Sequence, residues 1–151
     1  MARSRGAEDR SGPRLKSMLE YFSKIHRGEQ VDLEWVTSRG RMGTDWIPSE
    51  MEGAVIVEAH QSKGTTSASD TEDAVAAMVG SEIDLLVYSG GDGTTRDIVA
   101  SLSKLESSET PVIGVPSGVK MHSGCFASSP KGAAEVSVSY THLTLPTILL
   151  V

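Results

Sequence analysis

The amino-acid sequence predicts an α/β fold: a doubly wound, mostly parallel sheet with flanking helices. Two observations support this fold class. Short apolar runs, which suit buried strands, alternate along the chain with amphipathic helical patterns, and that alternation favours parallel crossover connections. Residues 85–88 (LLVY) are apolar or aromatic at every position, as in a strand that helices cover on both faces.

The first half of the chain predicts one long helix and two strands. Residues 1–12 are polar and are expected to be disordered. A helix begins at Pro13, because apolar residues then recur at helical spacing, namely Leu15, Met18, Leu19, Phe22 and Ile25. There follow a half-exposed strand at 31–35, a loop at 37–43, a short helix at 45–51 and a strand at 54–57.

The second half repeats the alternation of helix and strand. Ser69 and Glu72 have the spacing of a capping box, so a helix is expected to begin there. The central strand at 83–88 precedes an amphipathic helix with apolar residues Ile98, Val99, Leu102 and Leu105. There follow a strand at 112–115, helical structure at 119–126 and a helix at 131–136.

The composition fits one globular domain. The chain has 151 residues, of which 38% are hydrophobic and 23% charged, and this is enough to build a core. The net charge of −6 disfavours nucleic-acid binding, whose electrostatic footprint is basic. Cys125 is the only cysteine, which suits a reducing cytoplasm. Neither a membrane-spanning run nor a secretory signal is evident, so we expect a cytoplasmic protein without membrane partners.

The stretch that follows the central strand, Gly90-Gly91-Asp92-Gly93-Thr94-Thr95, predicts a phosphate-binding turn. Its glycines allow backbone angles that other residues resist, and they leave the backbone amides open to a ligand. The next helix presents free N–H groups and its positive end to the same place. Asp92 would repel phosphate, so its presence needs a reason. It can share Mg²⁺ with phosphates or accept a proton from an attacking hydroxyl, and both roles belong to phosphoryl transfer.

Two segments together resemble the ATP-NAD kinase-like family, within the superfamily of NAD kinases and diacylglycerol-type lipid kinases. The first is the glycine-rich turn with its continuation to Ile98. The second is residues 111–123, which read Pro-Val-Ile-Gly-Val-Pro-Ser-Gly-Val-Lys-Met-His-Ser. The resemblance runs from Trp35 to Glu135. It implies that the fold is the N-terminal domain of an NAD kinase-like enzyme, present incompletely.

The resemblance implies an ATP-dependent enzyme that phosphorylates NAD to NADP with Mg²⁺, or one that uses polyphosphate as donor. It assigns catalysis to Asp92, which would orient or deprotonate the ribose 2′-hydroxyl of NAD. Nucleotide or phosphate binding would fall to Gly90, Gly91, Asp92, Gly93, Thr94, Thr95 and Lys120.

Each of these roles has a plainer interpretation. Asp92 can belong to an ordinary Asp-Gly turn, the two threonines can cap the helix, and Lys120 can be a solvated surface lysine. We interpret His122 as a packed histidine and both Ser123 and Cys125 as helix-packing residues. No spacing of His and Cys indicates a zinc site, so no metal ligand is assigned.

Two other functions stay open at this stage. The first is a lipid or small-alcohol kinase on the same scaffold. Lipid kinases usually carry Gly-Thr-x-Asn-Asp where this chain has Ser-Gly-Val-Lys at 117–120, which disfavours that function. The second is a non-catalytic nucleotide- or phosphate-binding module. Small-molecule nucleotides are the expected partners, and a homo-oligomer is compatible with the full-length protein.

The tail needs separate treatment. Residues 138–147 (VSYTHLTLPT) can be read as the direct translation of a DNA string that resembles a transposase adapter used to prepare sequencing libraries. We therefore expect a partial NAD kinase-like domain at 13–137, a non-native tail at 138–151 and a fragment that is inactive alone. A natural β-hairpin is the alternative, because Val136, Val138 and Tyr140 alternate with polar residues.

Overall fold

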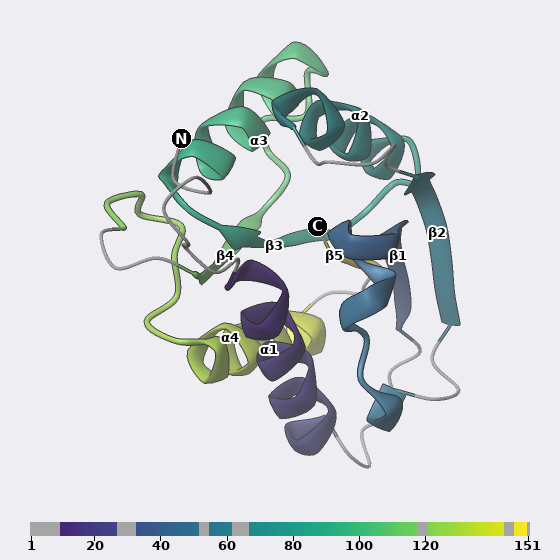
Figure 1. The fold of residues 1–151 in the computed structure, drawn as a ribbon, viewed down its shortest axis with the longest axis vertical. Coiled ribbons are helices and arrows are strands. Elements are labelled where there is room, and N and C mark those ends of the chain that lie inside the picture. Colours follow the sequence, from purple (N-terminus) through teal and green to yellow (C-terminus); the bar gives the residue numbers. More distant parts are fainter. Residues whose placement is uncertain are drawn as a thin grey trace.

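The fold is a parallel sheet between two layers of helices (Figure 1). The computed structural model describes residues 10–26, 33–51, 55–61, 67–117, 121–143 and 147–150. The strands are β1 (Glu34–Arg39), β2 (Val55–Gln61), β3 (Leu85–Gly90), β4 (Val112–Pro116) and β5 (Thr147–Leu150), in the spatial order β2-β1-β5-β3-β4. The helices are α1 (Ser11–Ile25), α2 (Ala68–Val79), α3 (Asp92–Lys104) and α4 (Pro130–Leu143). The predicted α/β class with a parallel sheet is confirmed.

Each face of the sheet has its own hydrophobic cluster, because side chains alternate along a strand. On β3, Leu85 and Val87 pack in the cluster of α1 and α4, whereas Leu86 and Tyr88 pack in the cluster of α2 and α3. The two helix pairs lie on opposite sides of the sheet in Figure 1. A strand between two helical layers must be apolar at successive positions, as the sequence of β3 is.

Strand β1 is buried more fully than its alternating sequence predicts. Four successive residues, from Trp35 to Ser38, are buried, and only the two ends of the strand are exposed. The prediction of a half-exposed strand is wrong because β1 pairs with a parallel neighbour on each side, β2 and β5. Helices also cover both of its faces: Trp35 packs with α1, and Val36 packs with α2.

Helix α1 buries the predicted stripe. Leu15, Met18, Leu19 and Phe22 are buried, while Ile25 is 43% exposed at the end of the helix. The helix begins at Ser11, so the prediction of disorder is wrong for residues 11 and 12. Residues 1–9 lie outside the described residues. Gly12 is buried against the indole of Trp46: a Cβ on Gly12 would lie 2.0 Å from a ring carbon. This close approach holds the start of α1 on the domain.

Two predicted helix positions need correction. The capping box of α2 consists of Ser67 and Asp70, since the Asp70 carboxylate accepts from the Ser67 N–H at 2.8 Å and the Ser67 Oγ accepts from the Asp70 N–H. The predicted pair lies two residues further along. Residues 121–126 are not helical. They run beside β4, where the Gly114 N–H donates to the Cys125 carbonyl oxygen at 2.9 Å.

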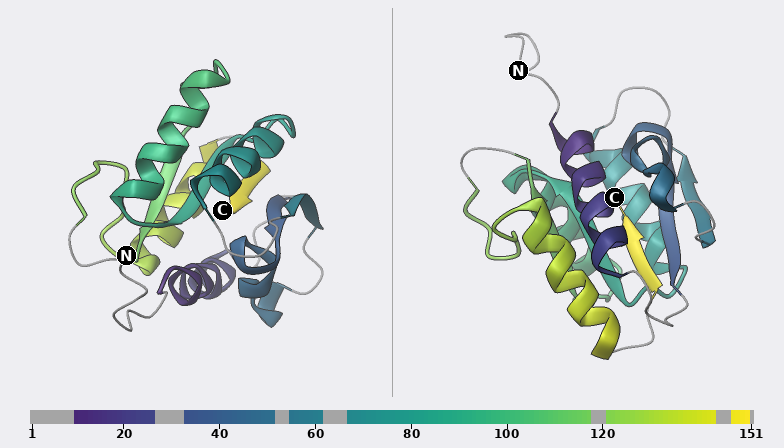
Figure 2. Two further views of the ribbon diagram at one scale, coloured as in Figure 1. Left: turned by 45° about the horizontal axis from the view of Figure 1, so that its top comes forward. Right: turned by 90° about the horizontal axis from the view of Figure 1, so that it is seen from below.

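The tail is placed within the fold. Helix α4 continues to Leu143, and β5 lies at the centre of the sheet between β1 and β3 (Figure 2). Its four residues pair with Glu34–Thr37 of β1, and three of them pair with residues 85–87 of β3. The hairpin alternative is therefore wrong, because residues 138–143 are helical. The foreign origin of residues 138–151 stays a prediction.

Candidate phosphate-binding site

The two segments that carried the family resemblance meet at one edge of the sheet. Strands β3 and β4 are parallel neighbours, and the last residue of β3, Gly90, pairs with Pro116 at the end of β4. From β1 the chain continues to β2 at one end of the strand order, and from β3 it continues to β4 at the other end. Ligands of open α/β sheets bind at the carboxyl ends of strands, where such connections diverge. The glycine-rich turn lies at such an edge.

Asp92 is the first residue of α3, and its carboxylate is held by the connection that follows β4. The Ser123 hydroxyl donates to Asp92 Oδ1 at 2.6 Å, and the Ser123 N–H donates to the same oxygen at 3.0 Å. The His122 N–H lies 3.1 Å from both carboxylate oxygens. Asp92 is half-buried rather than enclosed, so one aspect of the carboxylate still faces outward.

These donors also fix the charge of the carboxylate. The Ser123 hydroxyl, the Ser123 N–H and the His122 N–H, in that order of strength, hold the pKa of Asp92 below its ordinary value. Asp92 is therefore an anion at neutral pH. A carboxylate of low pKa is a weak proton acceptor, and its strength lies in orienting a hydroxyl group or attracting a cation.

The glycines of the turn differ from the sequence-based expectation. Gly91 has φ −112°, which any residue can adopt, and Gly40 is the one described glycine with positive φ. Gly90 is required for space, since a Cβ there would lie 2.6 Å from Thr94 Oγ1. Among the described residues, a Cβ on Gly91 or on Gly93 would meet no atom within 4 Å. Neither packing nor backbone conformation requires these two glycines. At both positions no side chain of their own covers the backbone, and we call this segment the bare start of α3.

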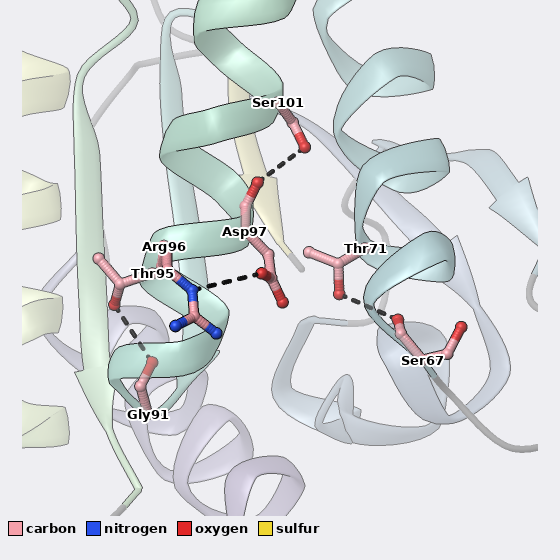
Figure 3. A network of polar contacts seen from close by, with 7 residues as sticks. All are labelled: Ser67, Thr71, Gly91, Thr95, Arg96, Asp97 and Ser101. Atoms are coloured by element: carbon pink, nitrogen blue, oxygen red, sulfur yellow. Dashed lines mark hydrogen bonds and ion pairs between the residues drawn. The ribbon is translucent and has the colours of Figure 1, made fainter.

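Thr95 points inward, away from any phosphate at the turn. It is 7% exposed, its hydroxyl donates to the Gly91 carbonyl oxygen at 3.2 Å, and the same hydroxyl contacts the Tyr88 hydroxyl. Its N–H donates to the same carbonyl at 3.1 Å. Figure 3 shows the side-chain contact to Gly91. Both donors of Thr95 are used inside the fold, and its assignment to phosphate binding stays a prediction.

Thr94 and Lys120, the other side chains predicted to bind phosphate, differ in what the structure shows of them. Thr94 is half-buried beside Gly90, and Lys120 lies outside the described residues. Neither threonine caps the helix, because the N-cap is Gly91 and no side chain bonds there. His122 is exposed and not packed, and the side chain of Arg96 at the same helix start is 82% exposed (Figure 3).

A buried polar group, the Tyr88 hydroxyl, contacts residues on both sides of the turn, and no sequence pattern indicates it. The Tyr88 hydroxyl lies 3.1 Å from Cys125 Sγ and also contacts Thr95. Burial, followed by the contact with Cys125, raises the pKa of Tyr88, so the phenol stays neutral. Gly114 lacks room for a side chain here, since a Cβ would lie 2.6 Å from the Phe126 ring. These contacts join β3, α3 and the connection after β4, so Cys125 is part of this set of contacts and not of a helix.

Among the described residues, no group of three His, Cys, Asp or Glu side chains could hold a metal ion. A single carboxylate beside exposed amides suits Mg²⁺ only when phosphate oxygens supply further ligands. Across the same part of the chain, no helix combines the length and apolarity needed to cross a membrane.

A comparison with protein-family models identifies the family of this chain. The family model described as the ATP-NAD kinase N-terminal domain matches residues 31–142. Searches of curated proteins and of solved structures found no significant match. The matched region contains β1 to β4 and nearly all of α4, with the glycine-rich turn and the Asp92 contacts inside it. The chain therefore belongs to the ATP-NAD kinase family and carries its N-terminal domain.

Proposed function

We propose that the turn at the start of α3 binds the phosphates of ATP, and that the protein takes part in phosphorylating NAD to NADP. The observation that supports this proposal is the bare start of α3, where Gly91 and Gly93 have open space around an anionic Asp92. A Gly within a helix lowers stability relative to Ala, so its presence at an unconstrained position needs a functional reason. Close approach of phosphate oxygens to the backbone amides supplies that reason.

In the proposed reaction, Asp92 acts on the acceptor hydroxyl of NAD. The hydroxyl oxygen forms a bond to the γ-phosphorus of ATP while the bond from that phosphorus to the bridging β–γ oxygen breaks, and ADP leaves. Asp92 orients the hydroxyl and takes up its proton, which passes on to solvent. Because the Asp92 carboxylate is a weak base, its main contribution is position and charge, as in other phosphoryl transfers.

The donor set fits Mg²⁺ that is shared between protein and nucleotide. Asp92 contributes a carboxylate, and the bare amides at Gly91 and Gly93 leave room for the phosphates that would carry the remaining charge. Bound Mg²⁺ would neutralise the negative charge of the phosphates. Polyphosphate presents the same oxygens to the turn, so calorimetric titration with each donor decides between them.

Gly93→Ala tests the proposal, because it separates binding from folding. The new methyl group meets no atom of the part of the chain that the structure describes, so we expect a gain of about 0.5–1 kcal/mol in the free energy of unfolding. The same methyl group covers an amide at the phosphate position, so we expect affinity for Mg·ATP to fall at least about tenfold. Urea unfolding and calorimetric titration of the full chain measure the two effects.

Gly80→Ala is the matched control. Gly80 caps the far end of α2 with φ −61°, and its Cβ would make ordinary contacts at 3.4 Å. It should stabilise the chain similarly and leave Mg·ATP affinity unchanged. If Gly93→Ala binds Mg·ATP as tightly as Gly80→Ala does, the bare helix start is not the phosphate site.

A further inference from the structure

The connection after β4 makes a contact with Asp92 that nothing in the sequence pattern indicated. Ser123 lies 31 residues beyond Asp92, yet both its side chain and its backbone reach the same carboxylate oxygen. The hydroxyl distance of 2.6 Å is that of a charge-assisted hydrogen bond between a hydroxyl group and a carboxylate. Such bonds are about twice as strong as those between neutral groups.

The two oxygens of the Asp92 carboxylate accept different numbers of hydrogen bonds. Oδ1 accepts from the Ser123 hydroxyl, the Ser123 N–H and the His122 N–H, which fills its capacity. Oδ2 has a single contact among the described residues, the shared His122 N–H at 3.1 Å. Oδ2 therefore keeps acceptor capacity for a ligand, and Oδ1 does not.

An aspartate at the first position of a helix would otherwise be free to rotate. Gly93 on its C-terminal side and Gly91 before it have no side chains that could limit its rotamers. Within the described parts of the chain, no atom lies within 4 Å of a Cβ built at either glycine, so neither neighbour of Asp92 adds a packing contact. The direction of the carboxylate thus depends on the connection after β4. Holding a reacting group in one geometry can contribute much of a catalytic effect.

We propose that Ser123 is a positioning residue, which binds Asp92 Oδ1 and so directs Oδ2 towards the acceptor hydroxyl. This inference rests on the proposed function for its catalytic consequence, but the contact itself can be tested without turnover. Ser123 acts through Asp92 and touches neither donor nor acceptor.

The first test measures the rotamer of Asp92 in the full chain. Three-bond couplings between Hα and Hβ should show one χ1 rotamer in the wild type and averaged values in Ser123→Ala. Ser123→Thr, which keeps the hydroxyl, should restore the single rotamer. Ser128→Ala is the matched control, since Ser128 is exposed on the same connection and should change nothing. A single, unchanged rotamer in Ser123→Ala would overturn the inference, whether or not the chain binds nucleotide.

The second test follows NADP formation by the product of the complete gene. Ser123→Ala should lower kcat about tenfold with little change in the KM for ATP, since only orientation is lost. In an Asp92→Asn background the same substitution should have no further effect, because the residue through which it acts is gone. Additive losses would overturn the inference. A wild-type enzyme without NADP formation would instead remove the proposed function, with the rotamer result still deciding the contact.

Discussion

Asp92→Asn should lower NADP formation by the product of the complete gene by about 10²–10⁴-fold, while ATP affinity measured without Mg²⁺ stays within about threefold of the wild type. The amide oxygen of Asn can still accept from Ser123 and His122, so the connection after β4 keeps its place. The substitution removes the negative charge and the second acceptor oxygen, which are the features assigned to orienting the acceptor hydroxyl. Steady-state assays and calorimetric titration measure both quantities.

Asp97→Asn is the matched control for this prediction. Asp97 lies on the same helix, and its partly buried carboxylate is 4.0 Å from Nε of the exposed Arg96 side chain (Figure 3). An ion pair at this distance with one exposed partner contributes little, so activity should be close to that of the wild type. Equal activity of Asp92→Asn and the wild type would remove Asp92 from the chemistry.

Ending the chain after Leu143 should abolish cooperative unfolding. This truncation removes β5, the central strand, and leaves β1 and β3 with unpaired edges that face each other. The ladder of β1 loses four residue pairs and that of β3 loses three, in a domain whose expected total stability is on the order of 5–15 kcal/mol. Thermal unfolding, followed by circular dichroism, compares the truncated chain with the full one.

A second variant keeps the length of the tail. Ile148→Pro places a proline opposite Trp35 of β1 and Leu85 of β3, where it removes a backbone donor from a central strand. Its melting temperature should fall well below that of the full chain. Unchanged melting in both variants would show that the tail contributes nothing to the stability of the sheet.

The sequence predicted features that depend on neighbouring residues. Helix α1 follows from apolar residues at helical spacing, because the buried face of a helix is set by its own positions. The glycine-rich turn between β3 and α3 is likewise local. The position of Asp92 at the start of α3 could therefore be predicted before any coordinates.

Features that depend on distant parts of the chain could not be predicted. Ser123 reaches Asp92 only because β3 and β4 are paired in a particular register, which the sequence does not specify. Thr95 turns inward because the Tyr88 hydroxyl lies beneath it, and a buried strand pattern gives no sign of a polar partner. Of the two reasons that the sequence offers for glycine in this turn, open space and not positive φ distinguishes Gly91 and Gly93.

Amide spectra of the full chain, recorded as Mg·ATP is added, test the central claim most directly. If the bare start of α3 binds phosphate, the largest shifts will be those of the Gly91 and Gly93 amides. The amides of His122 and Ser123, which bond to Asp92, will follow, and those of α1 will stay in place. Unchanged Gly91 and Gly93 amides at saturating nucleotide, or shifts confined to other elements, would contradict the account.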